Sequence, residues 1–129
     1  MQSIETHKKL KANGHYANVV VENGFAYVSG QFAVNPDTGE REFGSVEHQA
    51  RRALENIELW LRTVGSDRMH IVKTTAYIAD VSMWGGVDRI YAEFFGSHKP
   101  ARSVVPIKEL HFGFLIEIEA IASVGEKVS

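Results

Sequence analysis

The segment from Leu115 to Ala122 alternates between two kinds of residue with a period of two, which is the period of a β-strand. One face carries only apolar side chains: Ile116, Ile118, Ala120 and Ala122. The other face carries Leu115, Glu117, Glu119 and Ile121. The apolar set fits a core that helices cover. The chain must therefore build a sheet whose second face is neither a dry core nor an ordinary solvated surface.

A second strand-like segment, Lys99–Val105, carries Arg102 where a buried strand should have no charge. Arginine holds a planar carboxylate through two parallel hydrogen bonds, and a partly buried glutamate can hold or deprotonate a water molecule. An arginine on one strand and Glu117 on another can thus frame a small site. Glu119 has the same phase as Glu117, and we interpret it as a structural residue that pairs with Lys73 or Arg102.

Turn signals organise the first part of the chain. Asn23-Gly24 separates Val19–Glu22 from Phe25–Gln31 and predicts a hairpin, because both turn residues tolerate positive φ. The turn at residues 35–39 predicts a second hairpin between residues 32–34 and 40–43. The ends of the chain, residues 1–13 and 125–129, are expected to fray.

Capping signals place two helices and a strand between them. The first helix is predicted to run from a Ser45 cap to about Val64, where Gly65 ends it, and the second from Ser82 to about Phe95, where Gly96 ends it. The strand is predicted over Met69–Ala79, with Val72, Thr74, Ala76 and Ile78 on one side.

The predicted fold is an α+β domain with a mixed sheet and both helices on one face, since two helices cannot cover both faces of such a sheet. The uncovered face is too apolar for water and too polar for a dry core. It carries Phe25, Tyr27, Tyr77, Leu115 and Ile121 among Thr75, Glu117 and Glu119. A symmetric oligomer interface that contains pockets explains both properties.

Composition excludes several classes of function. The net charge is -2 and no run of Lys or Arg exceeds two residues, which argues against a dedicated nucleic-acid binder. The absence of cysteine excludes thiolate chemistry and suits a cytoplasmic protein. No apolar run approaches the roughly 20 residues of a membrane span. The histidines lack metal-ligand spacing, so no metal is expected, and Trp60 and Trp84 are interpreted as packing residues.

Seven motifs at compatible spacing resemble the reactive intermediate deaminase family, also called Rid, YjgF or endoribonuclease L-PSP-like. They lie between about Gly14 and Ala122. They are Tyr27-Val28-Ser29-Gly30-Gln31, Asn35-Pro36-Asp37-Thr38-Gly39-Glu40, Gln49-Ala50-Arg51 with Ala53-Leu54-Glu55-Asn56, Ile71-Val72-Lys73-Thr74-Thr75, Tyr91-Ala92-Glu93-Phe94-Phe95, Pro100-Ala101-Arg102-Ser103 and Ile116-Glu117-Ile118-Glu119-Ala120-Ile121-Ala122.

The resemblance implies that residues 1–129 form one Rid/YjgF-like domain of the chorismate-mutase-like type. It implies a homotrimer with a central β-barrel and with ligand sites in the clefts between subunits. The implied activity is that of a 2-iminobutanoate/2-iminopropanoate deaminase: hydrolysis of small 2-enamine and 2-imine acids to 2-oxo acids and ammonia, with no metal or organic cofactor.

The resemblance also assigns roles to individual residues. Arg102 falls on the arginine that binds the substrate carboxylate, and Glu117 on the glutamate that positions the hydrolytic water. Tyr16 falls on a pocket tyrosine and Ser29 on a strand serine. Three positions depart from the family pattern: His15 replaces a proline, Val104 stands where cysteine is common, and Asp88 replaces a pocket asparagine. Val104 is expected to touch the ligand only through its backbone, whereas the Asp88 carboxylate could repel an acidic substrate.

Two other functions stay open at this point. A module of the same fold could use Arg102 to bind a carboxylate metabolite without turnover, although such a module has no need of Glu117. A ribonuclease or translation inhibitor is the second alternative. The acidic net charge and the absence of a histidine pair or basic groove argue against it.

Overall fold

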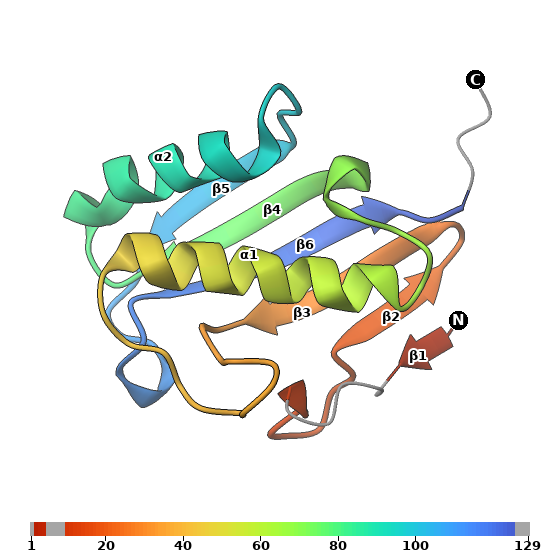
Figure 1. Ribbon diagram of the computed structural model, residues 1–129, viewed down its shortest axis with the longest axis horizontal. Coiled ribbons are helices and arrows are strands. Elements are labelled where there is room, and N and C mark those ends of the chain that lie inside the picture. Colours follow the sequence, from red (N-terminus) through yellow and green to blue (C-terminus); the bar gives the residue numbers. More distant parts are fainter. Residues whose placement is uncertain (1, 5–9, 126–129) are drawn as a thin grey trace.

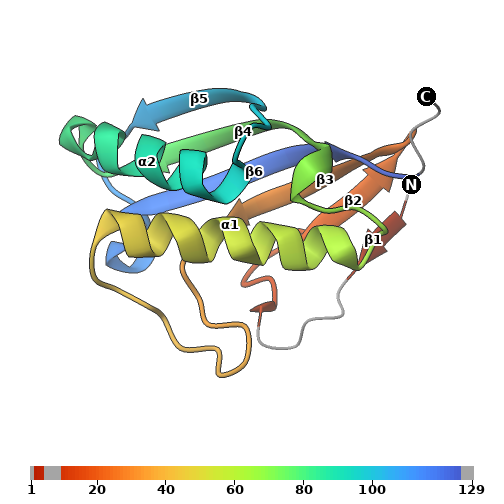
Figure 2. The same cartoon turned by 45° about the horizontal axis from the view of Figure 1, so that its top comes forward.

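The computed structural model describes residues 2–4 and 10–125 and contains a six-stranded mixed sheet in the order β1-β2-β3-β6-β4-β5. Both helices lie against the same face of this sheet (Figures 1 and 2). The strands are β1 (Gln2–Ile4), β2 (Val19–Glu22), β3 (Phe25–Gln31), β4 (Ile71–Ile78), β5 (Ala101–Pro106) and β6 (Ile116–Ser123). The helices are α1 (Val46–Arg62) and α2 (Trp84–Phe95), with short 3₁₀ helices η2 (Arg68–His70), η3 (Val81–Met83) and η4 (His111–Gly113). The expected chorismate-mutase-like α+β class is confirmed.

Helix α1 begins and ends as its capping residues predict. The Ser45 hydroxyl oxygen accepts a hydrogen bond from the backbone N–H of His48 at 3.1 Å, and Gly65 follows the helix with a φ of 79°. The inward face of α1 is fully buried against the sheet through Ala50, Ala53, Leu54, Ile57, Trp60 and Leu61. Burial of this stripe is the main reason that the helix is stable.

Helix α2 is the crossover between β4 and β5, the one parallel pair of strands among the described residues. It buries Val87, Ile90, Tyr91, Phe94 and Phe95. The Tyr91 hydroxyl lies 2.8 Å from the Thr74 hydroxyl of β4, and burial raises the pKa of Tyr91 to about 12. This buried hydrogen bond fixes α2 over β4, next to Arg102 of β5.

Strand β6 occupies the middle of the sheet and shows the expected alternation. Ile116, Ile118, Ala120 and Ala122 are buried beneath the helices, while Glu117 and Ile121 are partly exposed and Glu119 is exposed. The predicted hairpin of β2 and β3 is confirmed, and both of its turn residues have positive φ, 51° at Asn23 and 79° at Gly24. On the uncovered face, Phe25 and Tyr27 are 40% and 45% exposed.

Several element predictions are wrong in detail. Residues 32–34 and 40–43 do not form a hairpin of strands but share one bridge, between Val34 and Arg41. The second helix does not start at Ser82: Asp80 caps the 3₁₀ helix η3, and α2 begins at Trp84. The predicted fraying of residues 1–13 is also wrong in part, because Gln2–Ile4 pair with β2.

The strand predicted over Met69–Ala79 is shorter, because Met69 belongs to η2. Val72 was expected to face the core, yet it is 44% exposed. The register of β4 against β6 shifts between Ile71 and Lys73, and such a bulge turns the intervening side chain to the other face. The alternation beyond the bulge, from Thr74 to Ile78, is as expected.

Candidate functional site

Glu117 lies on the uncovered face of the sheet, directly against Gly30 of the neighbouring strand β3. A Cβ atom at residue 30 would fall 2.5 Å from the Glu117 carboxylate oxygen Oε2, so the backbone of β3 and this carboxylate can approach so closely only because residue 30 is glycine. The β3–β6 register is irregular between Val28 and Gln31, at this same point. The sheet is thus shaped locally around the Glu117 side chain.

The surroundings of the Glu117 carboxylate favour its protonated form. Burial raises the pKa of this group, and the nearby Glu119 carboxylate raises it further, while His111 acts in the opposite direction. Within residues 2–4 and 10–125, Glu117 forms no hydrogen bond or ion pair. A half-buried carboxylate without a protein partner is free to hold a water molecule or a ligand.

A cavity of about 470 Å³ opens in front of Glu117. Tyr16, Ser29, Phe32, His111 and Phe112 line it together with Gly30. The Ser29 hydroxyl donates a hydrogen bond to the Ala17 carbonyl at 2.7 Å, which gives Ser29 a structural role. Ser29 also lines the cavity. The hydroxyl of Tyr16 accepts a hydrogen bond from the backbone N–H of Asn13 at 3.2 Å, and the residue is 47% exposed.

Arg102 lies in a different place, beside helix α2. Its guanidinium lies 5.2 Å from the ring centre of Trp84 and 4.9 Å from that of Tyr91, within the range of a cation–π contact. Its Nη1 donates a hydrogen bond to Oδ1 of Asp88 at 2.9 Å. The group borders a second cavity, of about 510 Å³, which Lys99 also lines.

The two principal residues of the expected site therefore lie on opposite faces of the sheet. Arg102 is in register with Thr74 of β4, whose buried side chain points to α2. Glu117 is in register with Tyr77 of β4, whose side chain lies on the uncovered face. Since strand neighbours in register point to the same face, one sheet separates the guanidinium from the carboxylate within one chain. Tyr16 and Ser29 lie with Glu117, and Asp88 lies with Arg102.

One other expected contact differs from the structure. Glu119 pairs with neither Lys73 nor Arg102 but accepts a hydrogen bond from the Tyr77 hydroxyl at 2.9 Å, and this bond raises the pKa of Tyr77. Of the two tryptophans interpreted as packing residues, Trp60 is fully buried, while Trp84 is 46% exposed and lies beside Arg102. Val104 is partly buried and packs against the edge of the core.

The sequence analysis assigned no role to several lining residues, among them Gly30, His111 and Phe112. The sequence did offer a signal for Gly30, since a glycine within a strand often marks a place where another group approaches the backbone closely. The sequence offered no signal for Phe112. Its backbone is left-handed, with a φ of 61°, and an aromatic residue rarely adopts that conformation.

Comparison with known proteins shows the family of this chain. The family model described as "Endoribonuclease L-PSP" matches residues 6–124. The 2-iminobutanoate/2-iminopropanoate deaminase of Rattus norvegicus is 38% identical over 122 residues, which cover 95% of this chain and 89% of the rat protein. The chain belongs to the endoribonuclease L-PSP family, to which the Rid proteins belong.

Solved structures show the same relationship. A Rid-family protein of unknown function from Yersinia pestis, YyfA, superposes with a TM-score of 0.90 at 40% identity and covers 95% of this chain and 98% of its own. TdcF of E. coli, solved with bound serine, superposes with a TM-score of 0.89 at 34% identity and covers 97% and 100%.

Two further findings concern the part of the chain that the structure describes. No group of three or more His, Asp or Glu side chains is arranged there to hold a metal ion. None of its helices combines the length and the apolar character that a membrane crossing requires.

Proposed function

We propose that this protein is a hydrolytic deaminase that converts small 2-imino acids, and the 2-enamine acids that tautomerise to them, into 2-oxo acids and ammonia. The observation that carries the proposal is the Glu117 carboxylate. It is half-buried against Gly30, its pKa is raised, and it faces a cavity without a hydrogen-bond partner among the described residues. A module that only binds a carboxylate has no use for such a group. The names of the rat and human relatives agree with this activity.

The complete site forms between two copies of the chain. Arg102 and Glu117 lie on opposite faces of the sheet, so a small molecule bound on one face of a single chain contacts only one of them. The uncovered face exposes large apolar side chains, and the outer edge of β5 has no partner strand among the described residues. We infer a closed homotrimer in which the Glu117 cavity of one copy meets the Arg102 cavity of the next.

The chemistry needs little more than orientation. The two nitrogens of Arg102 that remain beside its bond to Asp88 hold the substrate carboxylate. Glu117 takes a proton from its water as the oxygen attacks C2, and the π electrons of the C=N bond move to the nitrogen. Glu117 passes this first proton to the nitrogen, which gives the carbinolamine. Glu117 then carries the hydroxyl proton to the amine nitrogen, so that the C–N bond breaks, ammonia leaves and the oxygen becomes the 2-oxo group. An imine carbon is already electrophilic, so one positioned water and one proton carrier suffice.

The test compares turnover with binding in a Glu117→Gln variant. An amino-acid oxidase generates 2-iminobutanoate in situ, and its decay is followed with and without the protein. We expect turnover to fall about 100-fold or more, because glutamine keeps the shape but cannot exchange a proton. The Kd for 2-oxobutanoate should change little, since Arg102 supplies that interaction. A wild-type protein that binds 2-oxobutanoate but never accelerates imine decay would contradict the proposal.

One observation bears equally on the deaminase and on the alternative of a carboxylate-binding module. Asp88 already occupies one nitrogen of the Arg102 guanidinium, and a substrate carboxylate has to bind beside this negative charge. A protein that binds 2-oxo acids without turnover would support this alternative. We regard the deaminase as the better account because of the raised pKa of Glu117 and its unpartnered carboxylate.

A further inference from the structure

The reaction proposed above leaves one cation beside the Glu117 cavity unused. The Arg41 guanidinium lies over the ring of Phe112, with its central carbon 3.8 Å from the ring centre. Phe112 lines the Glu117 cavity, and Arg41 lines a smaller cavity of about 170 Å³. The two cavities adjoin, because Asn13, Tyr16, Gly30 and Phe32 line both of them.

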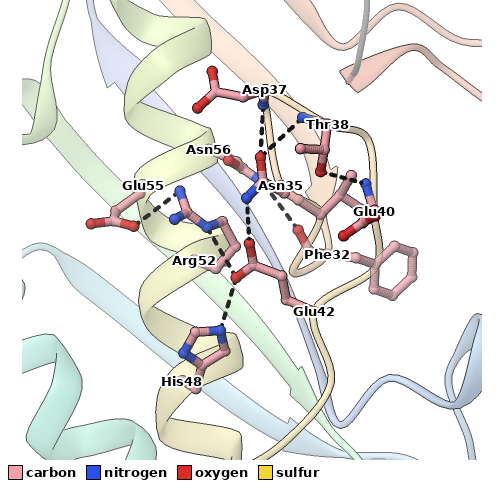
Figure 3. A network of polar contacts seen from close by, with 11 residues as sticks. Phe32, Asn35, Asp37, Thr38, Glu40, Glu42, His48, Arg52, Glu55 and Asn56 are labelled. Carbon is pink, nitrogen blue, oxygen red and sulfur yellow. Dashed lines mark hydrogen bonds and ion pairs between the residues drawn. The ribbon is translucent and has the colours of Figure 1, made fainter.

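The loop that carries Arg41 is tied down by a network of polar contacts (Figure 3). The side-chain oxygen of Asn35 accepts hydrogen bonds from the backbone N–H groups of Asp37 and Thr38, and its amide nitrogen donates to Glu42 at 2.9 Å. The backbone N–H of Asn35 donates to the carbonyl of Glu40 at 2.8 Å. Residues on both sides of Arg41 are therefore held by the same asparagine.

The same loop is anchored to helix α1. Glu42 contacts His48 at 2.8 Å and Arg52 at 3.4 Å, and Figure 3 shows these side chains converging on its carboxylate. The amide nitrogen of Asn56 donates to the carbonyls of Phe32 and Val34. This anchoring gives Arg41 a fixed backbone, and the aromatic contact orients its exposed side chain, so less entropy is lost when it binds a ligand.

The charge at this end of the cavity is positive and unneutralised. Arg41 forms no ion pair with any described residue, although most other arginines of the chain do. Lys11 lines the same small cavity. Glu117 is the one carboxylate of the described residues that lines the adjoining cavity. A ligand that extends from Glu117 towards Arg41 meets a planar cation that prefers a carboxylate.

We propose that Arg41 binds a second, distal carboxylate, so that the site accepts 2-imino dicarboxylic acids in preference to simple 2-imino acids. The inference rests on the proposed function, since C2 must lie at the Glu117 water. The carboxylate next to C2 binds Arg102 of the neighbouring copy. The side chain of the substrate then runs along Phe32 and Phe112 to Arg41.

The experiment measures binding and turnover for a matched pair of ligands. Calorimetry gives the Kd of 2-oxoglutarate and of 2-oxobutanoate, and the decay of 2-iminoglutarate and 2-iminobutanoate, each generated by an amino-acid oxidase, gives kcat/KM. The variant Arg41→Met keeps a long side chain over Phe112 but loses the charge and the planar fork. Arg62→Met, which removes an exposed arginine outside both cavities, is the control.

We expect the wild type to bind 2-oxoglutarate about 10-fold more tightly than 2-oxobutanoate, and Arg41→Met to abolish this preference, while Arg62→Met retains it. The ratio of kcat/KM for the two imines should change in the same way. Equal affinity for the two acids in the wild type would overturn the inference, as would an equal loss for both ligands in Arg41→Met, which marks a structural role. A binding preference without hydrolysis of either imine would support the Arg41 site and overturn the proposed deaminase.

Discussion

Arg102 and Glu117 lie on opposite faces of one sheet, although their strands are separated only by β4. Their partners across β4, Thr74 and Tyr77, point to α2 and to the uncovered face respectively. Each residue has its own cavity, of about 510 Å³ and 470 Å³. In the proposed reaction each cavity is one half of the site, and a second copy of the chain supplies the other half.

The first prediction concerns the carboxylate clamp. Arg102→Lys should lower kcat/KM for 2-iminobutanoate at least ~30-fold, because an ammonium group cannot form the two parallel hydrogen bonds and cannot lie flat beside Trp84 and Tyr91. Steady-state kinetics with oxidase-generated imine measure this loss. Arg51→Lys, which alters an exposed arginine paired with Glu93 on the outer helices, is the matched control and should behave as the wild type. Near-normal turnover in Arg102→Lys would place the clamp elsewhere.

The second prediction concerns Asp88. Its carboxylate accepts a hydrogen bond from Nη1 of Arg102 and adds a negative charge beside the proposed place of the ligand carboxylate. Asp88→Asn keeps a hydrogen-bond acceptor but removes the charge, so we expect 2-oxobutanoate to bind about 3- to 10-fold more tightly, a modest gain because the pair is partly exposed. Calorimetry measures the Kd, and Glu55→Gln removes an equivalent charge outside both cavities as a control. Weaker binding in Asp88→Asn would show that Asp88 orients the arginine instead of competing for it.

The third prediction concerns Gly30. In Gly30→Ala the new Cβ would displace the Glu117 carboxylate, which can swing away at little cost because it is the end of a flexible side chain. We expect kcat/KM to fall at least ~10-fold while Tm changes by only a few degrees. Gly85→Ala is the control, since a Cβ at residue 85 of α2 meets no atom within 4 Å. A fully active Gly30→Ala protein would mean that the position of Glu117 does not matter for the reaction.

The fourth prediction follows from the raised pKa of Glu117, whose first cause is burial. The folded protein keeps the Glu117 proton to a higher pH than the unfolded chain does. Ionisation of this group therefore lowers stability as pH rises from the unfolded pKa through the folded one. Glu117→Gln cannot ionise, so its Tm should match that of the wild type at acid pH and exceed it at neutral pH. In the pH profile of the wild type, kcat/KM should rise with a midpoint above pH 4.5, which is the ordinary pKa of a glutamate side chain. A variant less stable than the wild type at neutral pH would contradict this assignment.

Much of the fold was predictable because local signals and burial agree. The alternation of β6 places every second residue under the helices, and Asn23-Gly24 supplies the two positive φ angles of the hairpin. Val72 was not predictable in the same way, because the bulge that exposes it depends on the register between β4 and β6. Such a register is a property of two strands and cannot be read from one.

The site could be predicted only as a set of residues. Sequence spacing and the family resemblance selected Arg102, Glu117, Tyr16, Ser29 and Asp88. The face of the sheet on which each of these residues lies depends on how its strand pairs with the neighbouring strands. For Arg102, the parallel pairing of β5 with β4 determines the face. Phe112 could not be predicted as a lining residue, because the tertiary structure holds it at a positive φ that no local sequence preference indicates.

The most direct test of the account is subunit complementation between two inactive variants. Arg102→Ala and Glu117→Gln are mixed at equal concentration, unfolded and refolded together, and the trimer mass is confirmed by light scattering. If each site takes Glu117 from one copy and Arg102 from the next, random assembly leaves about a quarter of the sites intact, and about a quarter of the wild-type turnover of 2-iminobutanoate should return. Activity no greater than the sum of the two variants measured alone, in mixed trimers of the correct mass, would contradict a site shared between copies.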